Sequence, residues 1–94
     1  MNEIRHYAGI LVTAEPGELP SVVAALAALA GVGVHQRDAA TGRCVAVLES
    51  ADRAGQERLF RAVQALPAVR SADLVYHLVD PGTGPRLVLE EPAP

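Results

Sequence analysis

The residue types that most often bind metals or catalyse reactions are few in this chain and lie far apart. His6, His35 and His77 are on different segments, and none has a second ligand at the short spacing that metal sites use. Cys44 is the one cysteine, so an intrachain disulfide is excluded, and no base stands near it in sequence, which favours a buried structural thiol. Ser21 and the other serines are in no nucleophile motif. We therefore predict a protein that is not an enzyme and has neither metal nor cofactor.

The composition indicates one folded domain. A chain of 94 residues suffices for a single modest core, and half of the residues are apolar, which argues against disorder. The net charge of −3 argues against nucleic-acid binding, because that function needs clustered lysines and arginines. The N-terminus has no signal-peptide pattern, and no apolar run reaches membrane-spanning length. We expect a cytoplasmic protein that binds neither nucleic acid nor membrane.

The stretch from Gly31 to Glu49 has the pattern of a β-hairpin. Its first run, residues 32–37, alternates between two faces, and its second run, residues 45–48, is apolar. Gly42 lies between the runs and supplies the positive φ that such a turn needs. The sequence thus predicts a hairpin at the centre of the chain.

A strand and a helix precede this hairpin. Residues 7–13 are apolar nearly throughout, which is typical of a central strand. Residues 18–29 then place apolar side chains on one face of a helix. Pro20 falls in the first turn of that helix, where its missing N–H costs nothing.

A second helix and a last strand follow the hairpin. Ser50 or Asp52 can cap the helix, which Pro67 stops. Residues 69–79 form the strand, and the sequence Asp-Pro-Gly-Thr-Gly-Pro from residue 80 onward breaks it. We assign residues 1–80 to the folded domain and residues 81–94 to a flexible tail rich in Pro and Glu.

The two halves of the chain repeat one pattern. A shift of about 37 positions lays Ile10 on Val47 and Leu26 on Val63, so each half is a βαβ unit. Two such units predict an α+β, ferredoxin-like βαββαβ fold. Right-handed crossovers place both helices on one side of a four-stranded antiparallel sheet with the order 4-1-3-2. The other side of the sheet is left uncovered, and we call it the open face.

Alternation along each strand assigns side chains to the helix side or to the open face. The last strand is apolar on both faces, so its pattern does not assign its side chains by itself. The shift of 37 residues between the two halves, if applied exactly, would give the opposite assignment to the one that we choose here. We expect these residues on the helix side: Ala8, Ile10, Val12, Cys44, Ala46, Leu48, Ala72, Leu74 and Tyr76. We expect these residues on the open face: Tyr7, Gly9, Leu11, Thr13, Gly33, His35, Arg37, Arg43, Val45, Val47, Glu49, Asp73 and Val75.

Three of the open-face residues, Leu11, Val45 and Val47, form an apolar strip in the middle of the sheet. Apolar surface in contact with water is a candidate partner surface. Glu49 and Asp73 at its rim either accept a basic peptide or are ordinary solvated carboxylates. Tyr76 and His77 have two interpretations as well. One is a ligand contact, and the other, which we favour, is an aromatic ring that closes the core beside a histidine that is hydrogen-bonded at the edge of the sheet.

The hairpin and the last strand resemble the NapD family. The resemblance rests on GVGVH, DAATGR and VAVLE in the hairpin, and on LPAV and SADLVYH at the last strand, and GILV of the first strand is compatible with it. It extends in register over residues 7–78. Gly33 departs from the family pattern, in which we expect an acidic residue, so the second strand lacks that charge.

This resemblance implies a function. NapD proteins are small cytoplasmic maturation chaperones of periplasmic nitrate reductase with the ferredoxin-like fold. They bind the twin-arginine signal peptide of the catalytic subunit and hold it back from the Tat export machinery until the molybdenum cofactor is in place. On this basis we expect a monomer that binds this peptide on the open face, with its arginines near carboxylates. The expected peptide-binding residues are Gly9, Leu11, Thr13, His35, Val45, Val47, Glu49, Asp73 and Val75.

Two other classes of protein share the βαββαβ outline. Small-molecule-sensing regulatory domains usually dimerise and bind effectors between subunits, so dimerisation and stabilisation by an amino acid would favour that class. Acylphosphatase-type hydrolases need an arginine and an asparagine at a phosphate-binding loop. The one asparagine here is Asn2, which argues against the hydrolase.

Overall fold

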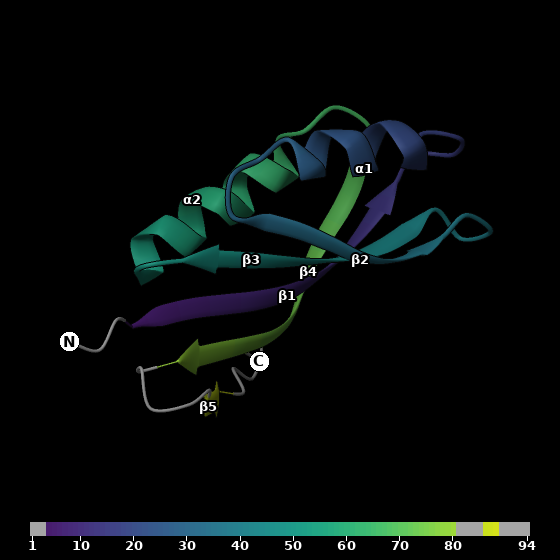
Figure 1. Ribbon diagram of the computed structural model, residues 1–94. Helices are drawn as coiled ribbons and strands as arrows, with labels where there is room; N and C mark the ends of the chain where they lie inside the picture. The colour runs from purple at the N-terminus through teal and green to yellow at the C-terminus, as the bar shows by residue number, and fades with distance from the viewer. Residues whose placement is uncertain (1–3, 81–85, 89–94) are drawn as a thin grey trace, which may run out of the picture.

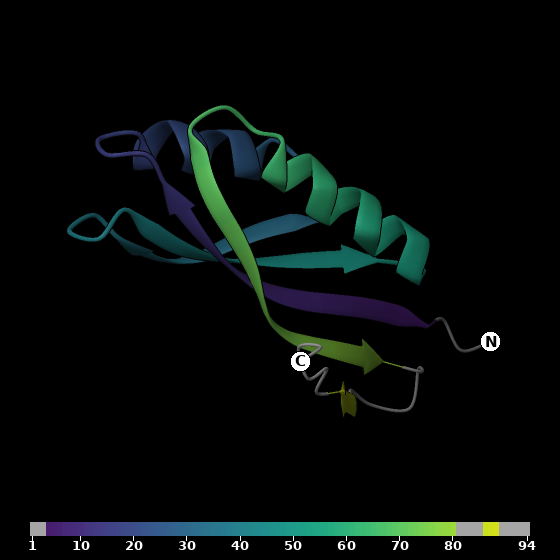
Figure 2. The ribbon, with the colours of Figure 1, turned by 180° about the vertical axis from the view of Figure 1, so that it is seen from behind.

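The computed structural model describes residues 4–80 and 86–88, which form a single sheet with two helices. Both helices lie on the same side of the sheet (Figures 1 and 2), and the other side is uncovered by any helix. The elements in chain order are β1 (Arg5–Ala14), α1 (Leu19–Ala27), β2 (Val32–Asp38), β3 (Arg43–Ser50), α2 (Arg53–Gln64), β4 (Val69–Asp80) and β5 (Arg86–Val88).

The sheet is antiparallel with the order β2-β3-β1-β4-β5. Its first four strands confirm the predicted ferredoxin-like fold and strand order. β5 is an addition that the sequence analysis did not predict, and it pairs with His77–Val79 at the edge of β4. The remainder of the predicted tail, residues 81–85 and 89–94, lies outside the described residues.

Both helices begin where the sequence predicts and end slightly earlier. Pro20 is in the first turn of α1, and the apolar face of this helix is buried. At α2, the Asp52 side chain accepts a hydrogen bond of 2.6 Å from the Gly55 N–H, which satisfies one of the free N–H groups of the first turn. Within the described part of the chain, neither helix is long and apolar enough to cross a bilayer.

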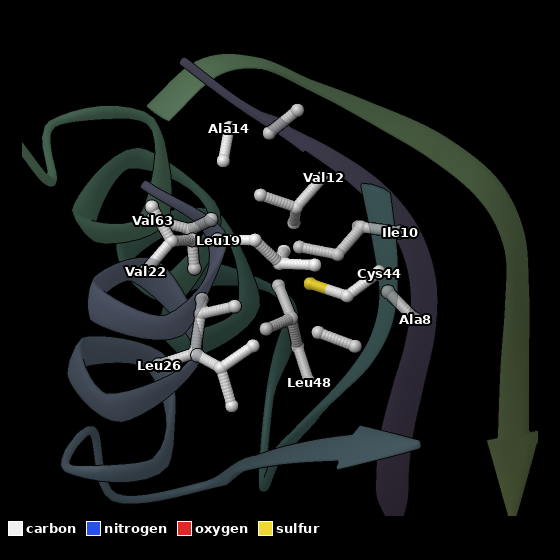
Figure 3. Packing of buried hydrophobic residues seen from close by; sticks show 13 residues of the cluster. Ala8, Ile10, Val12, Ala14, Leu19, Val22, Leu26, Cys44, Leu48 and Val63 are labelled. Atoms are coloured by element: carbon white, nitrogen blue, oxygen red, sulfur yellow. The ribbon is translucent and has the colours of Figure 1, made fainter. Parts of the chain in front are cut away.

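The core lies between the helices and the sheet and is packed mainly with aliphatic side chains (Figure 3). The predicted helix-side residues of β1 and β3 are all in it. Val63 is the one fully buried residue of α2, with Leu59 and Phe60 partly buried beside it. The buried core comprises Ala8, Ile10, Val12, Ala14, Leu19, Val22, Val23, Leu26, Cys44, Ala46, Leu48, Val63 and Ala72.

The turn of the β2–β3 hairpin forms as the sequence predicts. Gly42 has a φ of 70° and donates its N–H to the Asp38 carbonyl at 2.9 Å. The Asp38 side chain accepts a second hydrogen bond, of 3.0 Å, from the Ala40 N–H. The Gly42 carbonyl then accepts from the Ala14 N–H at 2.8 Å, so this turn also ties the hairpin to the end of β1.

A β-bulge in β4 contradicts one predicted side-chain direction. Gly9 pairs with Tyr76, whereas the next residue of β1, Ile10, pairs with Leu74, so Val75 is an extra residue in β4. An extra residue exchanges the two faces for everything that follows it. Ala72 and Leu74 are on the helix side as predicted, but Tyr76 is on the open face.

A second irregularity corrects the placement of Arg37. Val34 pairs with Ala46 and Arg37 with Cys44, so two residues of β2 lie opposite one residue of β3. Beyond this point Arg37 therefore follows the phase of the buried Cys44. The prediction that placed Arg37 on the open face with Gly33 is wrong for this reason.

The assignment of faces predicts opposite outcomes for two neighbouring substitutions in β3. Leu48 is fully buried, and its replacement by Asp removes apolar contacts worth about 2–5 kcal/mol and buries a carboxyl group at a further cost of about 1–3 kcal/mol. This loss is comparable with the whole stability of a small domain, about 5–15 kcal/mol. Circular dichroism should show Leu48→Asp unfolded and Val47→Asp folded. The reverse result would contradict the register of β3.

Candidate functional site

The middle of the open face is formed by β1 and its two neighbours. Leu11 lies between Val45 of β3 and Asp73 of β4, and Val47 pairs with Gly9 at the next position along the same face. These positions alternate with core residues on every strand, so their side chains point away from the helices. The predicted apolar strip is therefore continuous across the two central strands.

A shallow hollow adjoins the strip on the side of β2. Val47 pairs with Gly33 of β2, which carries no side chain that would fill the space on that side of it. The His35 ring reaches over Gly33, because a Cβ built on Gly33 would lie 3.5 Å from His35 Nε2. The hollow has a volume of about 400 Å³ and is lined by Tyr7, Gly31, Val32, Gly33, His35, Val47 and Glu49.

Tyr76 covers the backbone of the central strand. A Cβ built on Gly9 would lie 2.0 Å from Tyr76 Cε2, 2.5 Å from Cδ2 and 2.6 Å from Cζ. Cδ2 and Cζ are the two ring atoms bonded to Cε2, and they are only slightly farther from this Cβ position than Cε2 is. The ring therefore lies nearly flat on the strand. Gly9 is buried even though no helix covers this face, because the ring occupies the space of a side chain.

The sequence contains a signal for this contact at Gly9. Gly9 interrupts a strand that is otherwise rich in β-branched and bulky residues. A glycine inside a strand often marks the close approach of another group. The period of β4 alone could not reveal the contact, because the bulge at Val75 changes the phase.

Two carboxylates lie at opposite corners of the strip. Glu49 pairs across the sheet with Tyr7, and Asp73 pairs with Leu11, so they are four residues apart along β1 and on either side of it. Strand geometry places them roughly 16 Å apart. Glu49 Oε1 is 3.8 Å from Arg5 Nε, and both side chains are about half exposed, so this ion pair is weak.

The remaining predicted site residues lie further from the strip. Thr13 pairs with Arg43 and Ser71 near the far end of β1. Val75 is 61% exposed and, as the bulge residue, pairs with no residue of β1. The structure thus brings Gly9, Leu11, Val45, Val47 and Asp73 together, with His35 and Glu49 at the hollow, and leaves Thr13 and Val75 at the margins.

His77 faces the helix side of the sheet and has a structural partner. His6 Nδ1 and His77 Nε2 are 3.3 Å apart, which is within hydrogen-bonding distance, and His77 is only 4% exposed. The favoured interpretation is thus confirmed for the hydrogen bond of the histidine. It is wrong for the sheet edge, because β5 pairs with His77, and for the core-closing role of Tyr76.

Cys44 is a buried thiol on the helix side, as predicted. Burial raises the pKa of the thiol, and the nearby Arg37 guanidinium opposes this shift only in part. A raised pKa keeps the group in its unreactive thiol form at neutral pH. In the described ranges, no three His, Cys, Asp or Glu side chains come together as a metal-binding group. The arrangement on the open face is suited to binding an apolar and basic partner.

The comparison with known protein families settles the family. The NapD protein family matches residues 6–81 of this chain. The chain is a member of the NapD family. Its fold is also that of the solution structure of the E. coli Tat proofreading chaperone protein NapD, with a TM-score of 0.76 and 24% sequence identity over 81% of this chain and 80% of that one. No curated protein sequence matches the chain significantly.

The NapD match contains the whole open face and ends before β5. Every predicted peptide-binding residue lies within residues 6–81, including Gly9 and its neighbours on the strip. β5 starts at Arg86, beyond the matched region. The fold and the open face thus belong to the NapD part of the chain, whereas the fifth strand follows it.

The contact between Gly9 and Tyr76 predicts a coupled effect on stability. Gly9→Ala places a methyl group where the ring lies, which should cost about 1–3 kcal/mol in the free energy of unfolding. In a Tyr76→Ala background the same change should be neutral or slightly stabilising, because Ala is favoured over Gly in a strand by about 0.5–1 kcal/mol. Urea unfolding of the wild type, both single variants and the double variant measures this coupling. Equal costs in both backgrounds would mean that the ring does not occupy this position.

Proposed function

We propose that this NapD-family protein is a maturation chaperone of periplasmic nitrate reductase and binds the twin-arginine signal peptide of the catalytic subunit. It acts in the cytoplasm as a monomer and holds the subunit back from export until the molybdenum cofactor is in place. The observation that carries the proposal is the apolar strip of Leu11, Val45 and Val47 at the centre of an uncovered sheet face. Family membership and the fold shared with the E. coli Tat proofreading chaperone support the same role.

The geometry of the open face suits a helical peptide. A signal peptide has a basic front followed by an apolar stretch, and a helix formed from it can lay an apolar face into a groove. A separation of roughly 16 Å between Glu49 and Asp73 corresponds to about eleven helical residues. A helix of that length crosses the strip, fills the hollow beside Val47 and brings its basic end to a carboxylate.

Direct binding is the first expectation. A synthetic peptide with the sequence of the twin-arginine leader of the nitrate reductase from the same organism should bind with a stoichiometry of one to one. Isothermal titration calorimetry measures the stoichiometry, and the apparent Tm should rise with peptide concentration because the ligand binds the folded state. A titration without heat and without a shift in Tm would exclude the proposal. Dimerisation and stabilisation by a free amino acid instead would favour a small-molecule sensor.

The position of the peptide gives a second expectation. Val47→Asp puts a carboxylate under the apolar part of the peptide, where it loses its hydration on docking and finds no partner. The dissociation constant should rise about a hundredfold, which corresponds to about 3 kcal/mol. Calorimetry with the same leader measures the change, and circular dichroism establishes that the variant is folded.

Two further variants test the position of the charge and the contribution of the rim. Leu74→Asp adds the same charge at a position that is 44% exposed on the helix side, so binding should be unchanged. Glu49→Lys should weaken binding by a smaller factor that shrinks as salt is added, because exposed charges are screened. Normal binding by Val47→Asp, or equal losses in Val47→Asp and Leu74→Asp, would place the peptide elsewhere.

A further inference from the structure

Tyr76 presents one face of its ring to a partner on the open face. The near-flat position over Gly9 puts one face of the ring against the strand, so the other face is directed away from the sheet. Tyr76 is partly exposed, and both helices are on the opposite side of the sheet (Figure 2). An aromatic face carries negative electrostatic potential and attracts cations.

A carboxylate lies next to this ring. Asp73 pairs with Leu11, and Tyr76 with Gly9, so the two side chains occupy successive positions on the same face of β4. The spacing of Leu11 and Gly9 along β1 puts these positions roughly 7 Å apart. Asp73 is exposed, and among the described residues no cation forms an ion pair with it.

A flat ring with a carboxylate beside it favours one cation in particular. The guanidinium of arginine is planar and weakly hydrated, so it stacks on an aromatic face while its N–H groups donate to a carboxylate. The ammonium of lysine is a compact, strongly hydrated charge that cannot stack in this way. The pair therefore discriminates between the two basic side chains.

We infer that Tyr76 and Asp73 form a guanidinium-binding site on the open face and that this site takes an arginine side chain of the signal peptide. The assignment to the signal peptide rests on the function proposed above, whereas the guanidinium site itself rests on the geometry of the two residues. The bound arginine would set the basic end of the peptide at β4 and direct the apolar stretch toward the hollow beside Val47. Specificity for arginine would thus come from a ring that the β4 bulge turns to this face.

A small probe tests the site without the signal peptide. The protein contains two tyrosines and one phenylalanine, so the ring signals in a proton NMR spectrum are few. Tyr7 is an internal reference, because Glu49, the carboxylate beside it, already has Arg5 as a partner. Titration with N-acetyl-arginine methylamide should shift the Tyr76 ring signals more than those of Tyr7. The lysine analogue should give less than half of that shift, and Asp73→Asn should reduce the response to arginine. Equal responses of the two tyrosines, or of the two probes, would overturn the site.

The signal peptide tests the specificity. The wild type should bind the leader about tenfold more tightly than a leader in which both arginines are replaced by lysine. Tyr76→Phe keeps the ring and should keep this preference, whereas Tyr76→Leu keeps an apolar side chain and should reduce it to about twofold. An unchanged preference in Tyr76→Leu would overturn the inference and leave the proposed function standing.

Two outcomes remain distinct in this design. Failure of every protein to bind either leader would contradict the proposed function, and the arginine probe would then decide the guanidinium site alone. If Tyr76→Leu does not fold, Asp73→Asn replaces it in the peptide titration. Asp73 is exposed and asparagine is isosteric with aspartate, so this variant should fold. A preference that Asp73→Asn leaves at about tenfold would count against the site.

Discussion

The pairing of β1 with β3 on one side and with β4 on the other determines the position of both the core and the open face. Alternate residues of β1 face the helices, where Ile10 and Val12 are fully buried, and the residues between them face outward. A slip of one residue would carry Ile10 into water and Leu11 into the core. The burial of one face therefore also fixes which side chains lie on the open face.

Sequence reasoning succeeded where a local pattern and burial agree. The two helices, the hairpin turn at Gly42 and the alternation of β1 and β3 follow from periodicity and turn chemistry, and the structure has each of them. Leu11, Val45 and Val47 were placed on the correct face for the same reason. These strands are regular over the part that forms the strip, so counting by two is reliable there.

The failures come from places where the backbone departs from that period. The extra residue at Val75 gives β4 opposite phases before and after it, and no periodic pattern can assign both halves. Tyr76 was therefore assigned to the core, although the missing side chain at Gly9 leaves the space that its ring occupies. Arg37 was misplaced by the irregularity of β2 in the same way. β5 has only three residues and follows a segment rich in Pro and Gly, so it depends on the edge of β4 more than on its own sequence.

The fifth strand also limits how an extended chain could attach to this protein. Many proteins bind peptides by letting them join a sheet edge, so that backbone groups recognise backbone groups regardless of sequence. β5 already uses that edge at His77–Val79. An incoming chain therefore cannot pair with β4 at these three residues, and an extended peptide could join the described sheet only elsewhere along its edges. Under the function proposed above, this closed stretch of edge would leave the side chains of the open face to select the leader.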